Sequence, residues 1–222
     1  MKAAILGDGL LGTELAKLTG WDILSRKIGN FNIREFQSYI LDDYEVIINC
    51  IANTDTYSKI DIGHKQVNFI FPSNLSDYCC HKGIKLVHIS TEFVYAGNSS
   101  SASEDDLPIP HDSYYAKFKL LADHYISLTN SNYLICRLLH KPYPFPYDKV
   151  WNVQTSGDTV DKIAKLVIKL IEKNATGIIN VGTGKKKLKE IAPDREEIDA
   201  PGNVPLDTSM SLLKQNSILD LV

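Results

Sequence analysis

The stretch Ala3–Gly12 reads AAILGDGLLG, and the fold is inferred outward from it. Four apolar residues have the length of a short strand, and the segment 10–18 that follows the glycines has the apolar period of a helix. The glycines at positions 7, 9 and 12 form a GxGxxG pattern, which allows a tight turn and lets a pyrophosphate approach the helix N-terminus. The alternative is a plain glycine-rich turn. In this strand-to-helix context, the pattern favours a dinucleotide-binding site.

The same alternation of apolar strands and periodic helices continues along the chain. Strands are predicted at 3–6, 21–24, 46–49, 85–90, 133–138 and 177–181, and helices at 10–18, 33–41, 67–80, 114–128 and 159–172. Because these strands are apolar on both faces, they predict a parallel sheet covered on both sides, hence a doubly wound α/β fold. The polar segment 98–113 and the proline-rich segment 141–149 are expected to be loops.

Two domains are expected from this pattern. Residues 1–139, rejoined by 159–182, make up the dinucleotide-binding core. The segments 140–158 and 183–222 make up a small lobe.

Composition narrows the possible functions. The chain has 222 residues, 44% of them hydrophobic, and a formal net charge of −3 from 24 Lys and Arg against 27 Asp and Glu. There is no basic excess of the kind that binds nucleic acid non-specifically. The first apolar run is too short for a signal-peptide core or a membrane span, so we expect a cytoplasmic protein without membrane contact. Four cysteines without CxxC spacing indicate neither a zinc site nor a disulfide framework.

The end of the second strand indicates which nicotinamide cofactor is preferred. Arg26 and Lys27 follow it directly, where an acidic residue would suit the free ribose of NAD and a basic residue suits a 2′-phosphate. The pair therefore favours NADPH over NADH. The alternative is that both are solvated surface cations.

A tyrosine and a lysine lie one helical turn apart at Tyr115 and Lys119. Tyr78 and Lys82 show the same spacing, which arises easily by chance. Only Tyr115 comes after a strand that ends in hydroxyl residues, at Thr91, and the carboxyl ends of parallel strands are where such sheets bind ligands. Reduction of a ketone by hydride leaves an alkoxide that needs a proton, which a phenol beside an ammonium can give. Thr91 would hydrogen-bond the same oxygen.

These motifs together resemble those of the extended short-chain dehydrogenases/reductases, most closely the dTDP-4-dehydrorhamnose reductase group. Residues 87–97 read VHISTEFVYAG, 46–54 read VIINCIANT, and 115–119 read YAKFK. The resemblance implies catalytic roles for Thr91, Tyr115 and Lys119. It implies that the sugar is contacted by Thr91, Glu92 and His140. It implies cofactor contacts by Gly7, Gly9, Leu10, Leu11, Gly12, Arg26, Lys27, Asn32, Ile33, Ile51, Ala52, Asn53, Ser90, Tyr115 and Lys119.

The activity implied is an NADPH-dependent reduction of a nucleotide-linked 4-keto-6-deoxy sugar, by a homodimer or together with a partner enzyme. The alternative is a catalytically idle, NADP-binding regulatory or partner subunit. The C-terminal lobe is shorter than is usual in the group, and Val204 stands where an arginine for the diphosphate is expected. The candidate replacements are Lys141, Lys185–Lys187 and Lys189.

Overall fold

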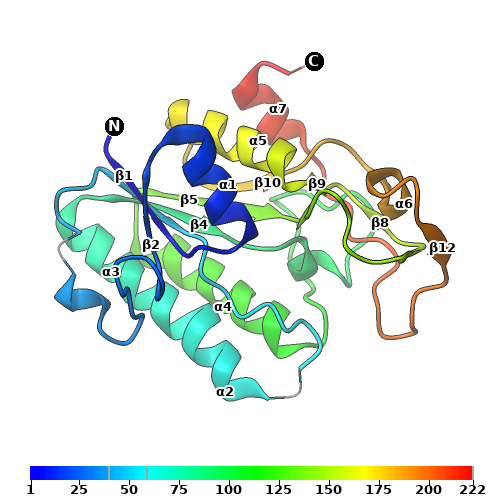
Figure 1. The fold of residues 1–222 in the computed structure, drawn as a ribbon, viewed down its shortest axis with the longest axis horizontal. Helices are drawn as coiled ribbons and strands as arrows, with labels where there is room; N and C mark the ends of the chain where they lie inside the picture. The colour runs from blue at the N-terminus through cyan, green and yellow to red at the C-terminus, as the bar shows by residue number, and fades with distance from the viewer. Residues whose placement is uncertain (40, 59, 222) are drawn as a thin grey trace.

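The computed structural model describes residues 1–39, 41–58 and 60–221. Its centre is a six-stranded sheet in the order β10-β5-β4-β3-β1-β2, with every neighbouring pair parallel (Figure 1). The strands are β1 Ala3–Leu6, β2 Asp22–Leu24, β3 Val46–Asn49, β4 Lys85–Ile89, β5 Tyr133–Leu138 and β10 Gly177–Val181. This confirms the predicted doubly wound fold. The strand order reverses between β1 and β3, which places a ligand-binding crevice at their carboxyl ends.

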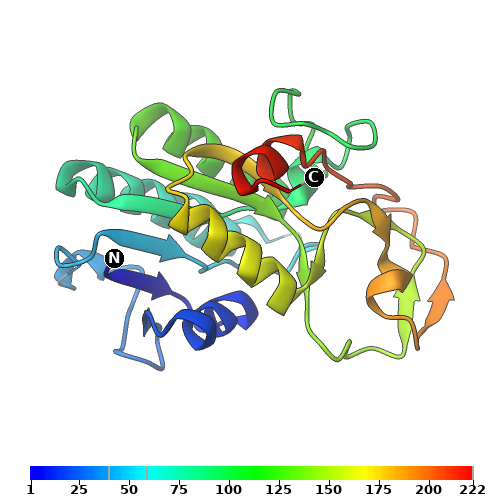
Figure 2. The same cartoon turned by 90° about the horizontal axis from the view of Figure 1, so that it is seen from above.

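Helices cover both faces of the sheet (Figures 1 and 2). One face carries α1 Leu10–Thr19, α5 Val160–Glu172 and α7 Leu213–Leu219, which pack over the apolar residues of the strands. The other face carries α3 Phe71–Lys82 and α4 Tyr114–Thr129. The chain reaches α3 through α2 Asp61–His64 and the wider helical stretch η2 Lys65–Ile70, so this helical segment begins earlier than predicted.

The predicted helix at 33–41 is wrong. In its place lies a loop with one short 3-10 turn, η1 Phe36–Ser38; Ile40 lies outside the described residues. The spacing that suggested a helix comes from buried aromatic residues that anchor the loop, since the ring of Phe36 contacts that of Phe71 at 5.7 Å between centroids. The side chain of Asn32 accepts the Arg34 N–H, which competes with helical hydrogen bonding.

A small lobe stands at the carboxyl end of the sheet, made of two- and three-residue strands and a single turn of helix (Figure 2). The pairs are β8 Gln154–Thr155 with β11 Lys186–Lys187, β7 Lys149–Trp151 with β12 Glu196–Ile198, and β6 His140–Lys141 with β9 Asp158–Thr159, and α6 is Leu188–Ile191. The chain then returns to the sheet, where α7 packs against α5 and β10. No helix in the described part of the chain is both long enough and apolar enough to cross a membrane.

Candidate active site

A cleft of about 530 Å³ opens between the carboxyl ends of the strands and the lobe. One end is formed by the glycine turn between β1 and α1, and the other by the lobe. Among the predicted site residues, those that line it are Gly9, Leu10, Leu11, Gly12, Ala52, Ser90, Thr91, Glu92, Tyr115, Lys119 and His140. Residues far apart in the sequence thus meet at the crevice that the strand order creates.

The glycine turn is shaped for close approach by a ligand. Gly7 has a φ of +107°, and a Cβ on Gly12 would lie 2.0 Å from the carbonyl oxygen of Gly7, so side chains are excluded at both positions. A Cβ on Gly9 would meet nothing within 4 Å, because this glycine faces open space. Gly9 also precedes α1 without a side-chain cap, which leaves the first backbone N–H groups of a ten-residue helix to a ligand. These features fit the pyrophosphate of a dinucleotide.

Thr91 and Tyr115 both line the cleft, and the Thr91 hydroxyl interacts with the Tyr115 phenol strongly enough to affect its pKa. Thr91 ends β4 and begins the short turn η3 Glu92–Tyr95, where its hydroxyl accepts the Phe93 N–H at 3.2 Å. Tyr115 lies in the first turn of α4, which Ser113 caps by accepting the Ala116 N–H. Burial raises the pKa of the phenol, and the bond to Thr91 opposes that rise. An uncharged phenol is the form that can donate a proton.

Lys119 lies one turn further along α4, with 1% of its surface exposed. Its Nζ donates to the Ile89 carbonyl and lies 3.1 Å from Nε2 of His88. Burial lowers the pKa of this lysine to about 8, while Asp123 and Cys50 oppose the shift. The ammonium can therefore lose its proton close to neutral pH.

Glu92 is buried where the core meets the lobe. Its carboxylate accepts hydrogen bonds from the hydroxyls of Thr155, at 2.6 Å, and of Thr208. Burial raises the pKa of Glu92 to about 7, against these hydrogen bonds and the nearby Lys141. His140 lines the same cleft, and burial followed by the charge of Lys141 lowers the pKa of that histidine to about 4. Both side chains line the cleft as predicted for sugar contacts, although Glu92 already uses both oxygens to hold the lobe.

Other predicted cofactor residues do not line the cleft. Arg26 and Lys27 are exposed just after β2, and Asn32 and Ile33 lie in the loop beyond them. Gly7 packs against Ile51, and the backbone N–H of Asn53 donates to Asn68 at 2.8 Å. Their cofactor contacts remain predictions.

Tyr78 and Lys82, the second tyrosine–lysine pair, lie elsewhere. Both bind Asp42, and neither lines the cleft.

Sequence reasoning missed a buried polar layer beneath the site. Arg137 and Asp123 form an ion pair at 3.0 Å with 2% and 0% of their side chains exposed, and Ser90 donates to the same carboxylate. His88 and Asn49 lie inside strands that were read as apolar. The available signal was a polar residue within each of these apolar runs.

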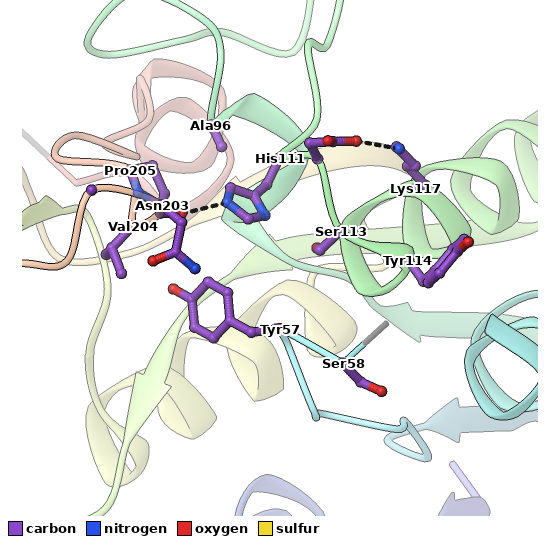
Figure 3. A pocket seen from close by; sticks show the side chains of 12 residues that line it. Tyr57, Ser58, Ala96, His111, Ser113, Tyr114, Lys117, Asn203, Val204 and Pro205 are labelled. Atoms are coloured by element: carbon purple, nitrogen blue, oxygen red, sulfur yellow. Dashed lines mark hydrogen bonds and ion pairs between the residues drawn. The ribbon is translucent and has the colours of Figure 1, made fainter. Parts of the chain in front are cut away.

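A second cavity, of about 780 Å³, adjoins the cleft and shares Tyr57, Val204 and Pro205 with it (Figure 3). His111 stands in its wall and donates from Nε2 to the Asn203 carbonyl oxygen at 2.7 Å. This contact links the loop before α4 to the segment that returns from the lobe.

Comparison with known proteins gives one family. The model described as "RmlD substrate binding domain" matches residues 1–140. A probable low-salt glycan biosynthesis reductase of Haloferax volcanii is 33% identical over 105 residues, which are 45% of this chain and 34% of that protein. A bifunctional dTDP-4-dehydrorhamnose 3,5-epimerase/reductase of Arabidopsis thaliana is 22% identical over 78% of this chain and 66% of its own. The chain thus spans between about a third and two thirds of the length of these relatives.

Solved structures share the fold. A dTDP-4-dehydrorhamnose reductase from Clostridium acetobutylicum superimposes with a TM-score of 0.80 at 21% identity, over 100% of this chain and 92% of that one. The corresponding enzyme from Bacillus anthracis, solved in complex with NADP, gives a TM-score of 0.81 at 21% identity, over 98% and 93%.

Proposed function

Because the chain belongs to the RmlD substrate binding domain family, we propose that it is an NADPH-dependent reductase of a nucleotide-linked 4-keto-6-deoxy sugar. The observation that carries the proposal is the meeting of Thr91, Tyr115 and Lys119 with the glycine turn in one cleft. The Bacillus anthracis enzyme of the same fold binds NADP, which supports the choice of cofactor.

Each of the three side chains has a distinct part in the reaction. NADPH, when bound, supplies the hydride that reduces the keto carbon. Tyr115 donates its phenol proton to the carbonyl oxygen, which would otherwise become an alkoxide. Thr91 holds that oxygen, since its hydroxyl lines the same cleft as the phenol and interacts with it. The ammonium of Lys119 favours the phenolate left on Tyr115.

The walls of the cleft support this substrate class. On the lobe side it is lined by Glu92, His140 and Lys141 together with Trp151. Hydrogen-bonding groups beside an indole suit a sugar ring. Lys141 supplies a cation for the diphosphate of the nucleotide.

The experiment is an assay of NADPH oxidation with a panel of nucleotide-linked 4-keto-6-deoxy sugars that differ in base. Turnover of at least one sugar, lost in Tyr115→Phe, supports the proposal. NADPH binding without turnover of any sugar would favour the idle partner subunit instead. Absence of NADPH binding would overturn both the reductase hypothesis and the partner-subunit hypothesis.

A further inference from the structure

Three side chains from three elements form a line beneath the cleft. Asn49 ends β3, His88 is its register partner in β4, and Lys119 lies on α4. Asn49 Nδ2 lies 3.2 Å from His88 Nδ1, and His88 Nε2 lies 3.1 Å from Lys119 Nζ. Asn49 and His88 are fully buried, and Lys119, which borders the cleft, is 1% exposed, so water can reach this group of side chains only at the Lys119 end.

The direction of the chain of hydrogen bonds is set at Asn49. The Ile51 N–H donates to Asn49 Oδ1 at 3.1 Å, so the amide nitrogen must face His88. That nitrogen is a donor, and His88 Nδ1 therefore accepts. Burial and the neighbouring Lys119 hold the pKa of His88 well below its usual range, so the ring is neutral and its one proton is on Nε2.

This tautomer points an N–H at Lys119. An amine has a lone pair to accept it, whereas an ammonium has only donors. If Lys119 is protonated, it cannot accept from the His88 Nε2–H. The His88 proton can then only be on Nδ1, where it faces the Asn49 N–H. One pair of donors then faces each other in either tautomer, and a buried hydrogen bond is lost. The donation from Nζ to the Ile89 carbonyl is open to both forms of the lysine.

Other charged and titratable groups around Lys119 do not remove this conflict. Asp123, one turn further along α4, favours the ammonium, but Arg137 Nε and Ser90 bind its Oδ2 at 3.0 Å each, and neither of its oxygens has a hydrogen bond from Lys119. Cys50 follows β3, and burial raises the pKa of its thiol to about 12, so it carries no charge near neutral pH. Tyr115, one turn before, is an uncharged phenol at rest.

We propose that His88, oriented by Asn49, is a positioning residue that holds Lys119 ready to release its proton. On release, one proton leaves the ammonium for the Tyr115 phenolate or for water, and the resulting amine accepts the His88 Nε2–H. Water returns the proton afterwards, so the protein is unchanged over a cycle. The use of this step in turnover rests on the proposed reductase function. The protonation equilibrium of Lys119 in the free protein does not depend on that function.

The test is performed on the free protein, without cofactor or substrate. Protein labelled with ¹³C at lysine Cε is titrated by NMR, and the Lys119 signal is assigned by its loss in Lys119→Arg. In the parent, Lys119 should titrate near pH 8. In His88→Gln, whose amide can turn its oxygen toward the ammonium, the midpoint should rise by about one pH unit, a tenfold gain in proton affinity.

Asn49→Asp provides a second variant by a different route. Its carboxylate accepts from both the Ile51 N–H and a His88 Nδ1–H, which frees Nε2 to accept from the ammonium, so the Lys119 midpoint should rise again. His124→Gln, an exposed histidine on the same helix, is the matched control and should leave the midpoint unchanged.

¹⁵N spectra of histidine-labelled parent protein read the tautomer without any substitution. Above the midpoint of Lys119, His88 should carry its proton on Nε2. A proton on Nδ1 at high pH, or a Lys119 midpoint that stays within 0.3 unit of the parent in the folded variants, would overturn the proposal. Because no step of the test uses NADPH or a sugar, failure of the reductase assay leaves this result standing, and the reverse holds too.

Discussion

Tyr115 and Tyr78 both precede a lysine by one helical turn, and their surroundings assign them different chemistry. Tyr115 meets Thr91 inside the cleft, whereas Tyr78 binds Asp42 outside it. Tyr115→Phe should lower kcat by about two to four orders of magnitude, since a positioned general acid is lost. NADPH affinity, measured by fluorescence titration, should be retained. Tyr78→Phe is the matched control, and an equal loss of kcat in it would refute the assignment.

Glu92 links stability to pH. Its pKa is raised from an ordinary 4.5 to about 7 in the folded chain, so the folded state binds this proton more tightly than the unfolded state. The resulting stabilisation is complete below pH 4.5 and is lost as the pH rises through 7, amounting to about 2 to 4 kcal/mol. In Glu92→Gln, which keeps the shape without the charge, urea unfolding should show this pH dependence removed. The variant should exceed the parent in stability at pH 8.

Glu172→Gln serves as the control for this measurement, because that carboxylate is exposed at the end of α5. Its slope of stability against pH should match that of the parent. If the slope of stability against pH in Glu92→Gln equalled that of the parent, Glu92 would titrate as an ordinary carboxyl.

At the scale of elements, the end of β2 should set the choice of cofactor. Arg26 and Lys27 follow this strand and are exposed, and we expect them to meet the 2′-phosphate of NADPH. Changing both to Ala should weaken NADPH binding about 10- to 100-fold, the range for losing charged hydrogen bonds, and leave NADH binding nearly unchanged. Calorimetric titration of both cofactors measures this. Lys17→Ala, a cation in the last turn of α1, should alter neither. Equal losses of affinity for NADPH and NADH would show that Arg26 and Lys27 do not bind the 2′-phosphate.

The short strand β6 carries the cation we assign to the diphosphate. Lys141 lines the cleft, whereas Lys185, Lys186 and Lys187 are paired with Asp207, Asp158 and Glu197. Lys141→Ala should weaken binding of a nucleoside diphosphate sugar about tenfold and reduce its dependence on salt. Lys187→Ala, whose ion pair is exposed at 3.7 Å, is the control. If Lys187→Ala lost more affinity for the nucleoside diphosphate sugar than Lys141→Ala, the diphosphate would instead be bound by the lysines at positions 185–187.

The elements also show what sequence can and cannot predict. Strand β1 was predicted because burial on both faces leaves an uninterrupted apolar run, and β3 and β5 because their apolar runs contain only one polar residue each, Asn49 and Arg137. The predicted helix at 33–41 was wrong because the Phe36 ring anchors a loop. Its packing against Phe71 is visible only in the structure.

The two-residue strands of the lobe escape prediction for another reason. β8 pairs with β11 across some thirty residues, and no local pattern encodes that pairing. At the site, the pairing of Thr91 with Tyr115 could be predicted from chain order, because Tyr115 comes after the strand that ends at Thr91. The contact of His88 with Lys119 needs three elements in space, so sequence spacing could not reveal it.

At the scale of the whole molecule, core and lobe are bound together by the chain's return. The segment that returns from the lobe carries Met210, which packs with Val94 and Tyr95 of the core, and Leu219 of α7 joins the core cluster of the sheet. The lobe's own apolar cluster is small, comprising Phe145, Val150, Leu188, Ile191 and Ala192. Such a cluster is too small to offset the conformational entropy of the lobe by itself. Lobe and core should therefore fold as one unit.

The two tryptophans test this directly, because Trp21 packs beside the core and Trp151 lies in β7 of the lobe. Trp21→Phe and Trp151→Phe each leave one fluorescent reporter, and urea unfolding followed through each should give coincident transitions with the same slope. Far-UV circular dichroism of both variants is the control for any difference in overall stability. A Trp151 transition at clearly lower urea than the circular dichroism of the same variant would show an independently unfolding lobe. In that event, the hydroxyl bonds of Thr155 and Thr208 to Glu92 would be too weak to keep the lobe attached to the core.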